Sequence, residues 1–311
     1  MIYRIRYLLL VFILLTSLIF RFYINYFIPV NQPINPPAIF AGLINLILLF
    51  VIIRQFTNYR IGLLAALLYA LSPWTAYLEL AASPHIFLLT ILSVIFRMSQ
   101  MFNINKKYSS VLLITAVTIY ILIFNQIKIF SNVGLINAVN SFRGETNQTA
   151  FSPMGKIIEN RYLYLSEHIL FNILKQFTPA TYFTNQAQLL GFSFSPPIFL
   201  GFIIPFMFGL IKLIKSFPRS KIPEVILIAF LLLPSILSEN SPDISSLVVI
   251  SPVIFYVISS GMYEFILNSR RKVFRFLLFL TILIVTFQFL TTISDIASRE
   301  PVRLQMFLNR K

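Results

Sequence analysis

The stretch PAIFAGLINLILLFVIIRQFTNYRIGLLAALLYALSPW, residues 37–74, decides the fold of this chain. It contains the apolar run 38–53 and most of a second run, 61–78, and the turn between them carries Arg54 and Arg60. A helix needs about 20 apolar residues to cross a bilayer, and somewhat fewer when flanking side chains snorkel to the interface. The stretch therefore predicts two membrane-spanning helices joined by a basic turn.

Apolar runs of this kind continue along the whole chain. Of its 311 residues, 58% are hydrophobic and 11% are charged, whereas about a quarter of the residues in an ordinary soluble domain are charged. We therefore expect an all-α, polytopic integral membrane protein that forms a single domain, residues 1–311. About nine transmembrane helices are predicted, at 7–27, 38–53, 61–78, 86–101, 111–124, 197–214, 222–237, 248–267 and 276–292. The first run lacks a small-residue cleavage site, which predicts an uncleaved helix.

Basic residues gather in alternate connections between these runs, and this pattern predicts the orientation of the protein. The segments 54–60, 102–110, 215–221 and 268–275 are expected on the cytoplasmic side, together with the N-terminus. The C-terminus and eight of the ten carboxylates are expected outside the cytoplasmic membrane. Because the net charge of +15 follows this topology, it indicates contact with anionic membrane lipids rather than with nucleic acid. The basic residues in question are Arg4, Arg6, Arg54, Arg60, Arg97, Lys106, Lys107, Lys212, Lys215, Arg219, Lys221, Arg270, Arg271, Lys272 and Arg275.

The outer segment 125–196 is too long for a plain connector. Within it, residues 157–177 have a helical period, with Ile169 and Ile173 on the apolar face and His168 and Asn172 on the polar face. Such an amphipathic helix either lies along a membrane surface or packs on the helix bundle, and the sequence favours neither arrangement.

Few residues offer metal or cofactor chemistry. The chain has no cysteine, its two histidines His85 and His168 are far apart, and no HExxH or phosphate-binding glycine motif is present. We therefore predict no cofactor, and a divalent cation stays possible without being indicated. The predicted spans are also nearly free of charged residues, which argues against a coupled transporter.

The outer connections hold the candidate reactive groups. Trp74, Glu79 and His85 follow the third run, and Glu239 and Asp243 precede the eighth. A carboxylate at a membrane–water boundary can act as a general base, because partial desolvation raises its pKa. The alternative, which we favour for each acid singly, is that these carboxylates cap helices, and Asp243 is well placed for this role.

Three stretches resemble membrane glycosyltransferases of the GT-C class, in the branch with protein O-mannosyltransferases and aminoarabinose transferases. The first is 37–74, which ends in Ser72-Pro73-Trp74; the others are NRYLYLSEHILFNILKQFTPATYF (160–183) followed by GFSFSPPIFLGFIIPFMFGLIKLI (191–214), and SENSPDISSLVVISPVIFYVISSGMYEF (238–265). The resemblance covers about 220 residues and implies a GT-C-like fold. It also implies transfer of a sugar from a polyprenyl phosphate to an acceptor on the outer face.

The chain departs from this family at its front. The first outer loop of the family carries a catalytic acid, whereas residues 27–37 here contain neither Asp nor Glu, as if a longer loop and its neighbouring helices were missing. If the chain is active, we expect Glu79 or Asp243 to be the base, Arg161 and Lys156 to contact phosphate, and Trp74, His85 and Glu239 to contact substrate. The alternatives are a non-catalytic relative that binds lipid or acts as a scaffold, and, less favoured, a transporter or lipid flippase.

Overall fold

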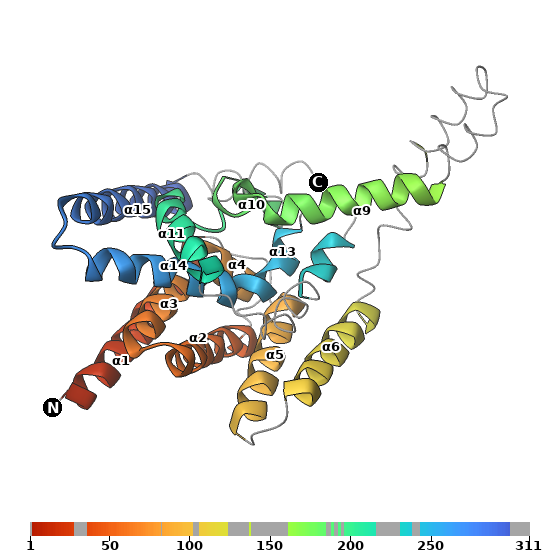
Figure 1. Cartoon of the computed structure of the whole chain (residues 1–311), viewed down its shortest axis with the longest axis horizontal. Helices are drawn as coiled ribbons and strands as arrows, with labels where there is room; N and C mark the ends of the chain where they lie inside the picture. The colour runs from red at the N-terminus through yellow and green to blue at the C-terminus, as the bar shows by residue number, and fades with distance from the viewer. Residues whose placement is uncertain are drawn as a thin grey trace, which may run out of the picture.

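The computed structural model describes residues 2–27, 36–81, 83–101, 106–123, 137, 161–184, 188–189, 192–193, 196–215, 231–237 and 243–298. Helices make up most of this part of the chain (Figure 1). A small antiparallel ribbon pairs β1 (Gln188–Leu189) with β2 (Phe192–Ser193). The helices are α1 (Ile2–Phe27), α2 (Pro36–Phe56), α3 (Tyr59–Leu71), α4 (Pro73–Leu80), α5 (Pro84–Met101), α6 (Lys106–Ile123), α9 (Arg161–Phe177), α10 (Pro179–Phe183), α11 (Ile203–Lys215), α13 (Ile244–Leu247), α14 (Ser251–Leu267) and α15 (Lys272–Ser298), with 3₁₀ turns η2 (Leu200–Phe202) and η4 (Val248–Ile250).

The predicted helical architecture with several candidate membrane spans is confirmed. Among the described residues, four helical segments are long and apolar enough to cross a bilayer, and α3 with α4 makes a fifth if the bent pair counts as one span. The helices α5 and α6 are apolar but shorter. Of the predicted span 222–237, only residues 231–237 belong to the described part of the chain, so the total of about nine spans stays a prediction. The four segments are Tyr7–Phe27, Pro36–Phe56, Ser245–Leu267 and Lys272–Ser298.

The third predicted span, 61–78, is broken at Ser72-Pro73. Ser72 has an extended backbone (φ −70°, ψ 119°), and Pro73 begins α4, which is bent by 54° from α3. Proline disfavours the helical conformation in the residue before it and cannot continue a helix, so the two residues end α3 and redirect the chain. The single span predicted at 61–78 is therefore two helices.

The helices α11 and α14 pack backbone against backbone. A methyl group at Gly209 would overlap the Val257 carbonyl, and one at Gly261 would overlap the Pro205 carbonyl. Gly209 and Gly261 also lie against each other, and Lys212 pairs with Glu264 three residues further along both helices, so the two helices run in the same direction with their C-terminal ends together. Because only glycine allows backbones to approach this closely, this pair is the small-residue interface typical of membrane helices.

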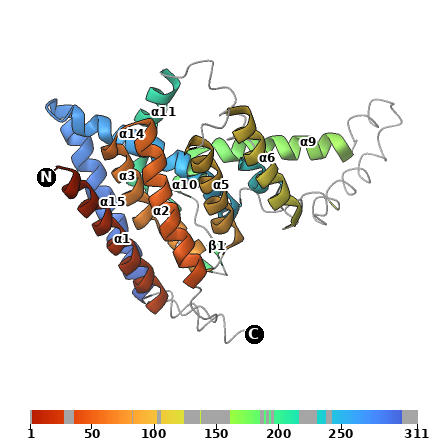
Figure 2. The same cartoon turned by 90° about the horizontal axis from the view of Figure 1, so that it is seen from below.

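The helix α9 lies crosswise to α5 and α6 (Figure 1 and Figure 2). Ile169 and Ile173 pack against the core, which is one of the two arrangements that the sequence left open, but Asn172, expected on the polar face, is fully buried. Its amide nitrogen donates to the Ile236 carbonyl (3.2 Å), which accounts for this burial. The opposite side of α9 exposes a second apolar ridge, which comprises Leu170, Phe171, Leu174 and Phe177.

Candidate functional site

Glu79 lies inside the helix bundle rather than in an open outer loop. It is on α4, and its carboxylate pairs with the guanidinium of Arg21 on α1; both side chains are 0% exposed. Arg21 Nη2 donates to Oε1 (2.8 Å) and Nε donates to Oε2, which makes the pair bidentate. Both carboxylate oxygens are therefore occupied by one buried cation.

Further groups complete the surroundings of this ion pair. The Tyr69 hydroxyl donates to Glu79 Oε1 (3.2 Å), and Arg21 Nη1 donates to the Ser17 hydroxyl and to the Ser17 carbonyl (3.1 Å). A side chain at Gly42 on α2 would overlap the carboxylate. Four helices thus enclose Glu79, and this arrangement holds α4 against α1 instead of presenting a base to a substrate.

The sequence-based prediction placed Glu79 in an outer connection and gave no role to Arg21, which lies within the first predicted span, 7–27. The sequence does contain one signal, since an isolated arginine and an isolated glutamate lie at the ends of apolar runs. A charge in such a position is expensive unless it finds a partner. The roles of Tyr69 and Gly42 depend on contacts between distant segments and carried no local signal.

A second polar cluster brings together two of the predicted site residues, His85 and Asp243. His85 lies at the start of α5, is 6% exposed, and forms a hydrogen bond through Nδ1 with the Tyr120 hydroxyl (2.5 Å). The Asp243 carboxylate is near enough to act electrostatically on both groups. Tyr120, on α6, had no role in the sequence-based prediction, because nothing local links it to His85.

Asp243 is the N-cap of α13, as the capping interpretation predicted. Its Oδ1 accepts from the Ser245 backbone amide (3.0 Å), and its own amide donates to the Ser235 hydroxyl (2.9 Å). The Ser235 hydroxyl in turn donates to Gln176 on α9 (3.2 Å). Among the described residues, Asp243 Oδ2 accepts no hydrogen bond, and the side chain is only partly buried, so one carboxylate oxygen can serve another purpose.

Of the other predicted contacts, the structure describes the side chain of Trp74 alone. Trp74 is 3% exposed and belongs to the core, not to the membrane interface expected from its sequence position. Arg161 is the first residue of α9, and its side chain lies outside the described part, as do the residues Lys156 and Glu239. Within the described residues, no three His, Asp or Glu side chains are arranged to hold a metal ion.

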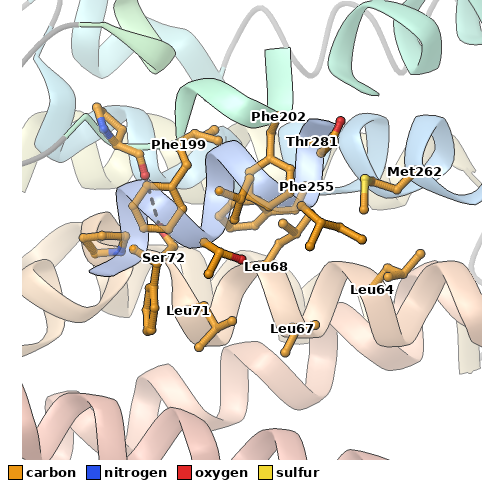
Figure 3. Close-up of a pocket in the computed structure, with 17 residues that line it drawn as sticks. Leu64, Leu67, Leu68, Leu71, Ser72, Phe199, Phe202, Phe255, Met262 and Thr281 are labelled. Atoms are coloured by element: carbon orange, nitrogen blue, oxygen red, sulfur yellow. Dashed lines mark hydrogen bonds between the residues drawn. The ribbon is translucent and has the colours of Figure 1, made fainter. Parts of the chain in front are cut away.

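An apolar cavity of about 240 Å³ opens between α3, α14, α15 and η2. Figure 3 shows Leu64, Leu67, Leu68 and Leu71 along α3, with Phe199, Phe202 and Phe255 across the space from them. At the end near α4, the Ser72 hydroxyl donates to the Pro197 carbonyl (3.3 Å). The lining residues are Leu64, Leu67, Leu68, Leu71, Ser72, Pro73, Pro197, Ile198, Phe199, Phe202, Phe255, Met262, Thr281, Ile282, Val285, Thr286 and Phe289.

One buried polar atom of the cavity wall has no partner. Thr281 is 1% exposed, and its hydroxyl makes no hydrogen bond in the described part of the chain. The rest of the wall is almost entirely carbon. Such a cavity excludes a sugar, whose hydroxyls would lose their hydrogen bonds there, and accommodates a hydrocarbon chain.

Compared with known proteins, the chain matches no family model, no curated protein and no solved structure. The resemblance to GT-C glycosyltransferases therefore stays a prediction from the sequence, and the arrangement of residues described above is the basis for assigning a function.

Proposed function

We propose that this chain is a GT-C-like protein of the cytoplasmic membrane with about nine spans, an inner N-terminus and an outer C-terminus. In this proposal it binds a polyprenyl-phosphate-linked sugar and transfers the sugar to an acceptor on the outer face. The observation that carries the proposal is the apolar cavity between α3, α14 and α15, because a donor of this kind needs a place for its hydrocarbon chain.

The size and direction of the cavity suit one segment of such a chain. Its leucines extend from Leu64 to Leu71, which at 1.5 Å per helical residue is about 10 Å. One end of the wall is formed by Ser72 and Pro73, the motif at which the resembled enzymes are most similar to this chain. The chain segment would lie along α3, and the phosphate and sugar would extend beyond α4 toward the outer face.

Transfer requires a base, and the surroundings of the two candidate acids favour Asp243 over Glu79. The base takes the proton of an acceptor hydroxyl, whose oxygen forms a bond to the anomeric carbon of the sugar. The bond between that carbon and the phosphate oxygen breaks, and polyprenyl phosphate leaves with the electron pair. Asp243 retains one carboxylate oxygen without a partner among the described residues, whereas Arg21 occupies both oxygens of Glu79.

Other predicted residues take supporting roles in this proposal. Arg161 and Lys156 would stabilise the departing phosphate electrostatically. His85, which is within electrostatic range of the Asp243 carboxylate, and Glu239 would contact the sugar or the acceptor. Trp74 would act indirectly by holding α4 in place, since it belongs to that helix and is buried in the core.

A non-catalytic role as a lipid-binding or scaffold protein is the second candidate. The specific observation in its favour is that both candidate bases have structural partners, Glu79 in an ion pair and Asp243 as a helix cap. This candidate keeps the cavity and its hydrocarbon ligand but predicts no turnover. Binding and transfer must therefore be measured separately.

The experiment uses purified full-length protein in nanodiscs with a photoactivatable polyprenyl phosphate and with radiolabelled polyprenyl-linked sugars. Leu68→Trp fills the cavity and should abolish crosslinking, whereas Leu283→Trp, on the exposed face of α15, should not. Asp243→Asn should bind lipid normally and lose transfer. Equal crosslinking of both Trp variants would refute the cavity as the lipid site; binding without transfer by the wild type with every donor would favour the non-catalytic role.

A further inference from the structure

The C-terminal ends of α11 and α14 lie together at the end of the bundle opposite the Ser72-Pro73 turn. The parallel glycine contacts of Gly209 and Gly261 align these helices, and an ion pair between Lys212 and Glu264 joins them one turn further on. The chain then turns at Asn268, whose amide donates to the Glu264 carbonyl (2.9 Å), and continues into α15.

Three phenylalanine rings fix the beginning of α15 against this pair. Phe208 on α11 contacts Phe265 on α14 with ring centroids 5.1 Å apart. Phe274 on α15 lies 6.0 Å from Phe208 and 5.9 Å from Phe265. The ends of the three helices therefore form one packed unit, and the side chains around it keep defined positions relative to one another.

Cations dominate the surface of this unit. Six exposed basic residues surround it, whereas Glu264 is the single carboxylate among its described residues and already pairs with Lys212. We call this surface the basic end surface; its members are Lys212, Lys215, Arg270, Arg271, Lys272 and Arg275.

Two of these cations occupy a position that a helix dipole makes unfavourable. Lys272 and Arg275 belong to the first turn of α15, which contains no acidic residue. Backbone N–H groups give this end of a helix a partial positive charge, so that anions stabilise it and cations do not. The positive charges of Lys272 and Arg275 therefore repel the partial positive charge at the start of α15, and a bound anion would reduce this repulsion.

Exposed apolar side chains border the same surface. Ile211 and Ile214 on α11 are 46% and 66% exposed, and Val273 and Phe276 on α15 are 67% and 61% exposed. A soluble anion such as free phosphate would use the cations and leave these side chains uncovered. A phospholipid uses both, because its headgroup meets the cations while its acyl chains cover the apolar residues.

We propose that the basic end surface is a binding site for the headgroup of an anionic phospholipid in the leaflet at that end of the bundle. The phosphate lies between the first turn of α15 and the 268–271 turn, and the acyl chains run along Ile214 and Val273. This site is separate from the cavity proposed for a polyprenyl donor and does not depend on that function.

The test uses full-length protein in a neutral detergent, to which cardiolipin, phosphatidylglycerol, phosphatidylcholine or inorganic phosphate is added at constant ionic strength. Native mass spectrometry measures lipid retention, and thermal unfolding measures stabilisation. Arg270→Gln/Arg271→Gln/Lys272→Gln removes three exposed charges. Arg270→Gln alone and Lys175→Gln, which removes one exposed charge from α9, form the matched single-charge comparison.

We expect the wild type to retain the two anionic lipids and to release phosphatidylcholine. The triple variant and Arg270→Gln should bind the anionic lipids roughly fivefold more weakly for each charge removed, and Lys175→Gln should bind like the wild type. Equal binding by Arg270→Gln and Lys175→Gln, or retention by the triple variant equal to that of the wild type, overturns the site. Stabilisation by inorganic phosphate as strong as that by the lipids overturns the assignment to a lipid.

Discussion

Replacing Glu79 by glutamine tests whether this carboxylate is structural. The substitution keeps the shape of the side chain and removes its charge, which leaves the Arg21 guanidinium charged and 0% exposed. Breaking a buried ion pair from one side costs about 3–5 kcal/mol, because the remaining charge is buried without compensation. At about 2 °C per kcal/mol for a chain of this size, the midpoint of thermal unfolding should fall by roughly 6–10 °C.

The assay is thermal unfolding of the purified protein in one detergent, followed by tryptophan fluorescence of Trp74, the only tryptophan. Trp74 lies on the same short helix as Glu79, so its emission reports directly on the release of α4. The exposed pair Lys212–Glu264 provides the matched control, because its side chains are 46% and 29% exposed. Glu264→Gln should cost about 0–1 kcal/mol.

A double variant separates the cost of an unpaired charge from the loss of a contact. Arg21→Gln/Glu79→Gln removes both charges, and we expect it to recover more than half of the stability lost in Glu79→Gln. If Glu79→Gln unfolds at the temperature of Glu264→Gln, the structural assignment is wrong. If it is fully stable and loses sugar transfer, Glu79 is the base after all.

Three further substitutions test the packing of α14 against α11, the cavity and the helix α9. Gly261→Ala pushes a methyl group into the Pro205 carbonyl and should destabilise the protein by about 1–3 kcal/mol in thermal unfolding, whereas Ser260→Ala on the same helix should cost less. Thr281→Val removes a buried hydroxyl that has no partner among the described residues. The substitution should raise the free energy of unfolding by about 1 kcal/mol and leave polyprenyl crosslinking unchanged. Weaker crosslinking would show that the hydroxyl binds the ligand. Partial burial and, to a smaller extent, the Lys175 ammonium lower the pKa of His168 on α9. The folded state therefore disfavours the protonated ring, and the free energy of unfolding should decrease as the pH falls below about 6.5. His168→Gln should remove that part of the acid sensitivity, and an unchanged pH profile of unfolding would contradict this reasoning.

Hydropathy and local turn chemistry predicted much of the fold. The apolar runs became helices because a segment in a bilayer must satisfy its own backbone hydrogen bonds, whatever surrounds it. The cap at Asp243 and the helix end at Ser72-Pro73 also depend only on neighbouring residues, and both are present. These features were accessible because each is decided within a few residues.

The interior of the candidate site was not accessible in the same way. Arg21 and Glu79 are 58 residues apart, and His85 and Tyr120 are 35 apart, so each partner is supplied by a separate helix. The expectation that polar side chains of α9 face outward and apolar ones face inward was also wrong in part, because Asn172 is buried and Phe171 is 63% exposed. A helix beside lipid can direct polar groups inward and apolar groups outward, which reverses the face assigned from a pattern made for water.

Residues 27–37 contain no acid, and the buried ion pair changes what this absence implies for function. In the resembled enzymes an acid just after the first span is the base, and here the chain carries Arg21 near the end of α1 instead. A cation in that position attracts a carboxylate, and Glu79 on α4 supplies it. The front of this chain therefore uses its charges to fix the turn that bounds the cavity, and of the two candidate bases Asp243 is the one that remains for the proposed transfer. We therefore expect Asp243→Asn and Glu79→Gln to have different defects: the first loses turnover, and the second loses stability of the fold.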